Sequence, residues 1–336
     1  MKQQNKNKSK NTSILPFVSL CTPTFNRRPF IPFMIKCFEH QTYPKDRIEW
    51  IIIDDGTDPI EELVKNIPQV KYFYYEEKML LGKKRNLMHT KCSGDIIIYM
   101  DDDDYYPPER ISHAVETLQQ NPSYLIAGSS EMHIYFNSKN QVYQCGPYKQ
   151  YHSTAATFAF KKELLLQTKY DDEIALAEEH KFTKGYTIPL IQLNSLKSIL
   201  VFSHKHNSLN KEKLLVNPEQ TKTRPSPYIV DDFVKEPILR QFYMHDMNTL
   251  LEKYELGKPE YKPKLLEQLA KMEAKRLENN LQKQTLCNNP VNVNTCITTL
   301  RNEYEKKLSD KNILINDLLK KIKQLTQELF EFKSKI

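Results

Sequence analysis

Glycine is scarce in this chain: 7 of its 336 residues are glycine, or about 2%, whereas the usual share is ~7%. Neither the G-x-G-x-x-G fingerprint nor the G-x-x-x-x-G-K-[ST] phosphate loop occurs. Their absence excludes the common dinucleotide-binding and P-loop classes. The nucleophile elbow G-x-S-x-G and the zinc motif H-E-x-x-H are missing as well, which argues against a serine hydrolase or a zinc protease of those types.

The chain also has no C-x-x-C pair and no long apolar run. Its six cysteines are scattered, which argues against a disulfide framework or a zinc ribbon and suits a reducing compartment. No apolar stretch approaches the roughly 18–20 residues that cross a bilayer. The first 13 residues contain lysines but no apolar core, unlike a secretory signal. We therefore expect no membrane span and a cytoplasmic location.

The charge balance has only a small positive excess. A formal net charge of +7 is spread among 49 basic and 42 acidic residues, whereas nucleic-acid-binding proteins concentrate such an excess on one face. We therefore expect no nucleic-acid partner. The glycine-poor, lysine-, asparagine- and isoleucine-rich composition suggests an AT-rich genome, such as that of a large DNA virus or a protist. A viral source would place the protein in the host cytoplasm or the virion.

The sequence divides into four parts. Residues 1–13 form a polar, basic tail that we expect to be disordered. Residues 14–210 alternate short apolar runs with helical patterns, which predicts an α/β domain with a mostly parallel sheet flanked by helices. Residues 211–300 are predicted to be a helical cap or linker. Residues 301–336 are predicted to be a coiled coil.

Four apolar runs define the expected sheet. They are Phe17–Cys21, Glu49–Asp54, Val70–Tyr75 and Asp95–Met100. Continuous β-branched runs are typical of strands that are buried on both faces. Two later runs, Met132–Phe136 and Val142–Cys145, flank turn residues and predict an appended antiparallel hairpin.

A heptad pattern occupies the C-terminal part. Apolar residues fall mainly at two positions of the repeat: Leu308, Ile315, Ile322, Leu329 and Ile336 at a, and Lys311, Leu318, Leu325 and Phe332 at d. Isoleucine at a with leucine at d favours a parallel two-stranded coil. We therefore expect a homo-oligomer formed through residues 308–336. An amphipathic helix packed on its own domain is the alternative.

Acidic residues follow two of the predicted strands. Asp101, Asp102, Asp103 and Asp104 come directly after one strand, and Asp54 and Asp55 close another. Open α/β sheets bind ligands at the carboxyl ends of their strands. Closely spaced carboxylates stay ionised only where water or a cation compensates, and a hard cation such as Mg²⁺ or Mn²⁺ suits them. A solvated acidic loop is the alternative.

The order of these motifs resembles that of the family 2 glycosyltransferases. Val18–Pro29 resembles the opening strand and its P-T-[YF]-N-R signature, and Glu49–Asp58 resembles the second strand with its DDGS-D turn. Leu80–Ile111 resembles the following helix with its Arg-Asn pair, the Ser-Gly-acid turn and the acidic strand end. The resemblance covers residues 16–110 in register. It implies a GT-A fold, a nucleoside-diphosphate-sugar donor, with UDP commonest, and Mn²⁺ or Mg²⁺.

The same resemblance implies a donor site. Pro23, Thr24, Phe25, Asp54 and Asp55 would hold the base and ribose, and Arg85 would lie near the nucleotide. Asp101 would contact ribose or metal, and Asp103 would be the principal metal ligand. The implied donor-binding set is completed by Asn26, Arg27, Lys83, Asn86 and Asp102.

Two further segments resemble the acceptor and metal parts of this family. Ala177–Phe182 resembles the E-D-x-x-F segment, whose second acid acts as general base, so Glu179 is the implied base and Glu178 the second choice. Here glutamate stands where the family usually has aspartate. His204–Ser208 resembles an H-x-x-N-[ST] element, which would make His204 a metal ligand. The alternatives are a charged helix face and a solvent-exposed histidine.

Taken together, the sequence predicts a metal-dependent inverting glycosyltransferase. It would move a sugar from a nucleoside-diphosphate sugar to a hydroxyl of a glycan or protein, an EC 2.4-class reaction. The alternative is a non-catalytic nucleotide-sugar-binding scaffold that is oligomerised by the C-terminal coil. A nucleotidyltransferase would normally show a glycine-rich phosphate loop near the N-terminus, which is absent.

Overall fold

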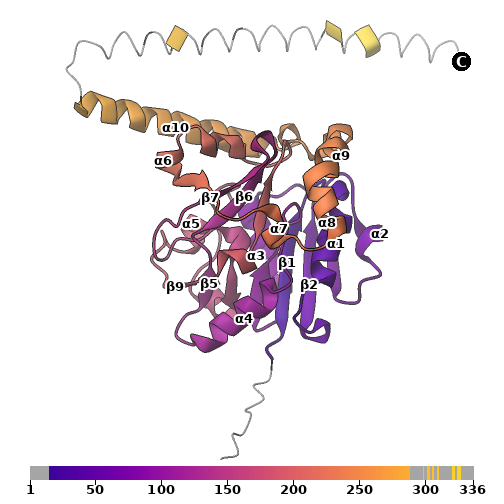
Figure 1. Cartoon of the computed structure of the whole chain (residues 1–336). Helices are drawn as coiled ribbons and strands as arrows, with labels where there is room; N and C mark the ends of the chain where they lie inside the picture. The colour runs from indigo at the N-terminus through magenta and orange to yellow at the C-terminus, as the bar shows by residue number, and fades with distance from the viewer. Residues whose placement is uncertain are drawn as a thin grey trace, which may run out of the picture. The chain divides into compact units, whose positions relative to one another are not determined.

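The computed structural model describes residues 15–287, with residues 298, 301, 302, 305, 309, 320, 321 and 324–326 beyond them. A first compact unit ends at Leu269, and a second begins at Ala270 (Figure 1). The predicted tail 1–13 lies outside the described residues. So do all the predicted heptad positions except Leu325, and the coiled coil stays a prediction.

The first unit is built on a seven-stranded mixed sheet. Its strand order is β3(Val70–Tyr74), β2(Ile48–Asp54), β1(Val18–Thr24), β4(Ile96–Tyr99), β8(Ala159–Lys161), β5(Ile126–Gly128) and β9(Leu190–Gln192). The four strands from β3 to β4 are parallel. Strand β8 runs antiparallel to both of its neighbours, and β5 pairs in parallel with β9. The four strands expected from the apolar runs are the parallel ones.

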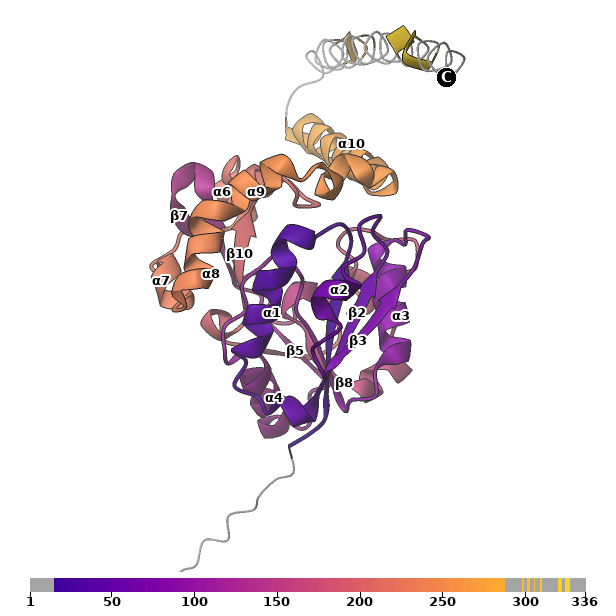
Figure 2. The ribbon, with the colours of Figure 1, turned by 90° about the vertical axis from the view of Figure 1, so that its right-hand side faces the viewer.

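Helices cover both faces of this sheet (Figure 2). On one face, α1(Ile31–Glu39) and α4(Arg110–Gln120) share a core with Trp50 and Ile52 of β2, and α4 lies against β5 and β8. On the other face, α3(Leu81–Lys91) and α5(Glu179–Phe182) share a core with Ile51 and Ile53 of the same strand. Successive side chains of a strand point to opposite faces, so the run of isoleucines in β2 serves both cores. The predicted α/β class with flanking helices is confirmed.

A second sheet has four strands in the order β10(Leu200–Ser203), β6(Met132–Phe136), β7(Gln141–Cys145) and β11(Thr223–Pro225). The predicted hairpin is its β6–β7 pair, which is antiparallel. Strand β10 runs parallel to β6. Leu200 of β10 also forms a β-bridge with Tyr105, which directly follows the four aspartates after β4. Residues 204–208, which follow β10, therefore lie in the same region as these aspartates.

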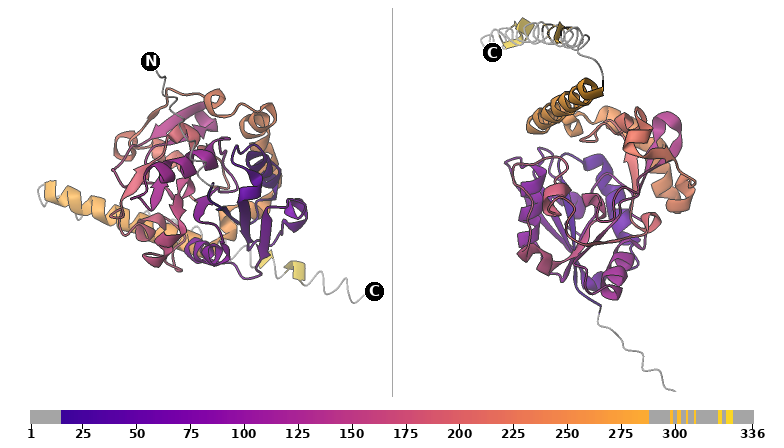
Figure 3. Two further views of the ribbon diagram at one scale, coloured as in Figure 1. Left: turned by 90° about the horizontal axis from the view of Figure 1, so that it is seen from below. Right: turned by 90° about the vertical axis from the view of Figure 1, so that its left-hand side faces the viewer.

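Five short helices complete this part of the chain. Helix α2(Glu61–Val64) lies between β2 and β3, and α6(Pro218–Thr221) precedes β11. Three more follow β11: α7(Val230–Phe233), α8(Pro237–Gln241) and α9(Met247–Lys253). The orange helices α8 and α9 lie beside the indigo helix α1 (Figures 2 and 3). Phe242 stacks on Phe33 with ring centroids 3.5 Å apart. Tyr243 donates to the carbonyl of Asp104 over 2.9 Å. Residues 230–253 thus belong to the same core as the sheet.

The last described helix, α10(Pro263–Cys287), begins inside the first unit. None of the described helices combines the length and apolarity that a membrane span requires.

Candidate active site

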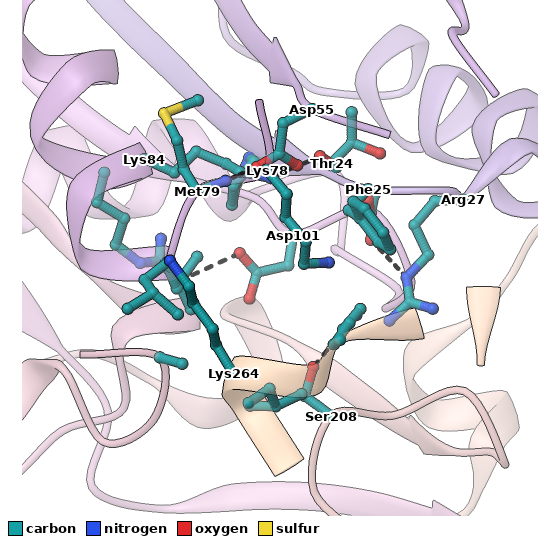
Figure 4. A pocket seen from close by; sticks show the side chains of 18 of the residues that line it. Thr24, Phe25, Arg27, Asp55, Lys78, Met79, Lys84, Asp101, Ser208 and Lys264 are labelled. Atoms are coloured by element: carbon teal, nitrogen blue, oxygen red, sulfur yellow. Dashed lines mark hydrogen bonds and ion pairs between the residues drawn. The ribbon is translucent and has the colours of Figure 1, made fainter. Parts of the chain in front are cut away.

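The parallel strands bring three loops to one edge of the sheet. In the register, Thr24 at the end of β1 lies beside Asp54 at the end of β2, and the acidic residues start two positions after β4 ends. A cavity of about 320 Å³ opens at this edge (Figure 4). Its lining comes from these loops, from α3 and the residues just before it, and from later parts of the chain around residues 175, 208 and 262–265. The lining residues are Pro23, Thr24, Phe25, Arg27, Asp55, Lys78, Met79, Leu80, Leu81, Lys84, Arg85, Asp101, Asp102, Ala175, Ser208, Lys262, Pro263, Lys264 and Leu265.

Of the two aspartates at the end of β2, Asp55 faces the cavity and Asp54 supports the turn. The carboxylate of Asp54 accepts hydrogen bonds from the backbone of Gly56 (2.9 Å) and Ile60 (3.2 Å) and from the hydroxyl of Tyr72 (2.7 Å). Asp55 accepts from the amide of Met79 over 2.7 Å and pairs with Lys84. Only the second carboxylate is therefore placed to meet a ligand.

Helix α3 presents a different lysine to the cavity from the one that the sequence indicated. Lys83 is exposed to solvent, whereas Lys84 is buried, donates to the carbonyl of Thr24 over 2.7 Å and lines the cavity. Asn86 points away and holds the loop at Tyr170 by accepting its amide and donating to its carbonyl, both over 2.9 Å. The sequence alone does not distinguish Lys83 from Lys84, because which of them faces the cavity depends on how α3 is oriented against the sheet.

The loop after β1 is bent at Asn26, whose φ of 51° is left-handed. Its side chain binds Thr57 and the amide of Asp58, so Asn26 holds two loops together and does not line the cavity. The next residue, Arg27, contacts two carboxylates: Nε lies 3.5 Å from Oδ1 of Asp102, and Nη2 lies 3.2 Å from Oδ2 of Asp103.

The four consecutive aspartates have different environments. Burial raises the pKa of Asp102 to about 7 despite the nearby Arg27. Burial also raises the pKa of Asp101, against the attraction of Arg85. For Asp103 burial acts in the same direction, but Arg27 and His204 outweigh it and lower its pKa. Asp104 is buried and accepts the amide of Phe202 over 3.1 Å, a structural contact.

His204 lies beside Asp103, as a shared ligand role would require. Its Nε2 is 3.3 Å from Oδ2 of Asp103, and burial lowers the pKa of His204 to about 4 despite that carboxylate. The ring is therefore neutral near pH 7, the form in which imidazole binds metals. The side chain is fully enclosed, so the alternative of a solvent-exposed histidine is wrong.

Donor atoms at this edge suit a divalent cation. Oδ1 of Asp101 is buried without a hydrogen-bond partner, and carboxylate oxygens with a neutral imidazole are ligands that Mn²⁺ accepts. Within the described part of the chain, however, no three His, Cys, Asp or Glu side chains converge closely enough to form a metal site. The chemistry of Asp101, Asp103 and His204 fits the ion, and the metal assignment remains a proposal.

Two glutamates stand at the start of α5, opposite α3. Oε1 of Glu178 accepts from Nε of Arg85 over 3.0 Å. Glu179 forms no ion pair among the described residues. Burial and the charge of Glu178 raise the pKa of Glu179 to about 7. Its carboxyl can therefore take up or release a proton near neutral pH.

Part of the cavity is lined by residues that the sequence motifs did not predict. Lys78 precedes α3, and Ser208, Lys262, Lys264 and Leu265 come from later in the chain. Except for Ser208, which is the serine of the H-x-x-N-[ST] element, these residues belong to no sequence motif. They reach the cavity only through tertiary contacts, which a local pattern cannot indicate.

The fold matches that of a known class. The fold is the GT-A arrangement, a Rossmann-like mixed sheet flanked by helices. The family model described as Glycosyl transferase family 2 matches residues 19–176, which contain the first parallel strands, the acidic residues and Arg85. The N-terminal domain therefore carries a family 2 glycosyltransferase match.

Similarity to individual proteins is weaker and partial. An uncharacterized glycosyltransferase of Haemophilus influenzae is 29% identical over 112 residues, covering 32% of this chain and 44% of that protein. The GalNAc(5)-diNAcBac-PP-undecaprenol beta-1,3-glucosyltransferase of Campylobacter jejuni is 30% identical over 130 residues, covering 37% of this chain and 38% of that protein. The chain thus spans less than half the length of these curated relatives.

Similarity to solved structures is low as well. The mannosyltransferase PcManGT from Pyrobaculum calidifontis, in complex with GDP-Man and Mn²⁺, superimposes with a TM-score of 0.48 at 17% identity. The match covers 78% of this chain and 76% of that one.

Proposed function

We propose that the protein is a glycosyltransferase that uses a nucleoside-diphosphate sugar as donor. One observation carries the proposal: the cavity at the carboxyl edge of the sheet combines carboxylates with an excess of cations. Six cationic and three acidic side chains line it. Carboxylates can bind ribose hydroxyls or a base N–H, while the cations suit phosphate oxygens. The family match of residues 19–176 supports the same reaction class.

The donor is expected to lie across the loops that end β1, β2 and β4. Phe25 offers an aromatic face to the cavity, and Asp55 and Asp101 offer carboxylates. Arg85 holds Asp101 in place, with Nη2 3.6 Å from Oδ1. We therefore assign base and ribose binding to Pro23, Thr24, Phe25 and Asp55. Asp54 acts indirectly, by shaping the turn that presents Asp55.

The reaction is proposed to depend on Mn²⁺ or Mg²⁺. Asp103 and His204, with Asp101, would hold the ion, which would neutralise the diphosphate and take up charge as the leaving group departs. The exposed fraction of these side chains is small, so the charge of a leaving diphosphate would meet little screening by water.

Glu179 is proposed to be the general base. The oxygen of the acceptor hydroxyl would attack the anomeric carbon while its proton passes to the carboxylate of Glu179. The bond between the anomeric carbon and the phosphate oxygen would break, and the nucleoside diphosphate would leave with both bonding electrons. Attack from the face opposite the leaving group inverts the configuration. Glu178 is less suited because it is paired with Arg85.

The acceptor is expected to be a hydroxyl of a glycan or a protein. The name of the Campylobacter jejuni relative specifies transfer to a glycan-bearing substrate, which favours the first of these. Homo-oligomerisation through residues 308–336 and a cytoplasmic location, whether in a viral host or not, stay predictions. Truncation after residue 300 tests the predicted oligomerisation. If the number of subunits per particle in solution does not change, residues 308–336 do not oligomerise the protein.

A panel of nucleoside-diphosphate sugars tests the function. The full chain is incubated with each donor and with Mn²⁺, Mg²⁺ or a chelator, and release of nucleoside diphosphate is measured. We expect metal-dependent release from at least one donor, even where water replaces the acceptor. Tight binding of a donor without turnover, with or without candidate glycan acceptors, would favour the alternative of a nucleotide-sugar-binding scaffold.

A further inference from the structure

The C-terminal segment of the first unit closes one side of the cavity. Lys262, Lys264 and Leu265 line the cavity, although they lie far beyond the 19–176 region of the family match. Hydrogen bonds fix this segment to both sides of the site. Asn26 donates to the carbonyl of Leu256 over 3.0 Å, and Gln268 accepts the amide of Ala175 over 2.9 Å.

Three of the six cations of the cavity already have an acidic partner. Lys84 pairs with Asp55, Arg85 with Asp101 and Glu178, and Arg27 with Asp102 and Asp103. These contacts neutralise the cationic charge on the side of α3 and β4. A ligand anion would gain little by competing with them.

Lys78 and Lys262 differ from these cations because, in the described structure, neither forms an ion pair. Lys262 is only 9% exposed. Among the described residues, its ammonium group makes one hydrogen bond, a long contact of 3.4 Å to the hydroxyl of Ser208. Lys78 is partly buried, and burial lowers its pKa to about 7. Keeping both ammonium groups charged in these surroundings without a counter-charge is costly.

The two lysines flank one aromatic ring. Nζ of Lys78 lies 2.9 Å from the ring centroid of Phe25, and Nζ of Lys262 lies 5.5 Å from it. Figure 4 shows Lys78 and Phe25 pointing into the same cavity, with Lys264 on the side of Ser208. Contact with the ring compensates each ammonium only in part, because the ring carries no net charge. An anion with several oxygens would compensate both.

We propose that Lys78 and Lys262 form a two-lysine anion site that binds the diphosphate of the donor. This inference rests on the proposed function and adds to it a binding residue, Lys262, that lies outside the region of the family match. The C-terminal segment would thus supply part of the donor site, and donor binding would require residues from both ends of the first unit. Lys264, which is exposed at the cavity wall, would assist by long-range attraction.

Inorganic pyrophosphate is the direct probe, because it carries the phosphate chemistry without a base or sugar. Its affinity, and that of UDP and uridine, is measured by calorimetry on the full chain in the presence of Mg²⁺. The variants are Lys78→Met and Lys262→Met, which keep much of the aliphatic side chain and remove the charge. Lys253→Met, an exposed position on α9, is the matched control.

Each of the two site variants should weaken pyrophosphate binding at least tenfold, while Lys253→Met should leave it unchanged. If uridine binds, its affinity should not change in any variant. The melting temperature of free Lys262→Met should not fall, because a poorly compensated charge has been removed, but its increase on adding pyrophosphate should shrink. Lys262→Arg should restore binding. A general loss of folding would lower the melting temperature without this pattern.

The outcomes separate this inference from the function on which it rests. Equal pyrophosphate affinity in wild type and both methionine variants overturns the two-lysine site, even if donor hydrolysis is observed. A wild-type protein that binds no pyrophosphate overturns it too. Loss of binding in the variants of a protein that hydrolyses no donor would keep the anion site and reject the transferase.

Discussion

Arg85 and Glu178 form a buried ion pair, with Nε of the arginine 3.0 Å from Oε1 of the glutamate. The pair joins α3 to the start of α5 and leaves Glu179, the next residue, without an ion-pair partner among the described residues. It also places Arg85 between Glu178 and Asp101, so one guanidinium links the proposed acceptor and donor sides. This arrangement distinguishes the two adjacent glutamates by role.

Substituting the proposed base should block transfer but spare donor binding. In Glu179→Gln the side chain keeps its size and loses the ability to accept the hydroxyl proton, so kcat should fall by about 10²–10⁴-fold. Nucleoside diphosphate affinity, measured by calorimetry, should remain within about twofold. A Glu179→Gln enzyme with normal kcat would show that another group removes the proton.

Glu178→Gln should behave differently, because it leaves Arg85 with a weaker partner. Breaking a buried pair by removing one charge costs about 3–5 kcal/mol, so we expect a lower melting temperature as well as lower activity. If both variants lost activity equally with unchanged stability, the ion pair would not separate their roles.

The pH dependence of transfer should report the same carboxyl. The pKa of Glu179 is raised to about 7, and the base acts only when it is deprotonated. At saturating donor and acceptor, kcat should therefore rise about tenfold per pH unit below 7 and level off above it. Glu179→Gln should lose this limb of the profile. A wild-type rate that is flat from pH 5 to 8 would exclude Glu179 as the base.

Metal binding should depend on the residues around Asp103. Asp103→Asn and His204→Gln should each lower the affinity for Mn²⁺ in the presence of nucleoside diphosphate by about 10- to 100-fold, as paramagnetic resonance of free Mn²⁺ can measure. Asp46→Asn is the control, because Asp46 is exposed and lies just before β2, at the end of that strand away from the cavity. Unchanged Mn²⁺ affinity in Asp103→Asn would remove it from the ligand set.

Glu49 should matter for folding rather than for chemistry. Its carboxylate accepts from the hydroxyl of Ser19 and the amide of Ser93, each over 2.5 Å, and pairs with Lys71 over 2.6 Å. Although burial opposes ionisation, these contacts lower the pKa of Glu49 to about 2. Glu49→Gln should lower the free energy of unfolding by about 1.5–3 kcal/mol, against no change for the exposed Glu163→Gln.

The sign of the pH effect at Glu49 follows from its lowered pKa. The unfolded carboxyl titrates near its ordinary value of 4.5, so the stabilisation is fully present above that pH and is lost as the pH falls toward 2. Denaturant unfolding at pH 7 and pH 3 should show the difference between wild type and Glu49→Gln shrinking at the lower pH. An undiminished difference would mean that packing, not charge, explains the effect.

Much of the parallel sheet could be predicted because its strands are continuous apolar runs. Strand β2 is buried on both faces, and five of its six residues from Ile48 to Ile53 are apolar. Strands β5 and β9 have three residues each, too few to show a period. Their place in the sheet depends on pairing with β8 and with one another.

The sequence motifs predicted which loops form the candidate site, but not which side chains of those loops point into the cavity. Asp54 and Asp55 are alike in the sequence, but only the fold shows that Asp54 turns toward Gly56 and Asp55 toward the cavity. Lys83 and Lys84 differ in the same way on α3. Lys262 reaches Phe25 only through contacts of the C-terminal segment, so no local pattern could indicate it.

The proposed function requires that the sheet-edge cavity bind a nucleoside diphosphate together with a divalent cation. This requirement can be tested through the melting temperature of the full chain with UDP, GDP, CDP, ADP or dTDP, each with Mn²⁺ and with a chelator. We expect a rise of several degrees for at least one nucleotide with Mn²⁺, and a smaller rise or none with the chelator. No shift with any of the five nucleotides in the presence of Mn²⁺ would contradict it.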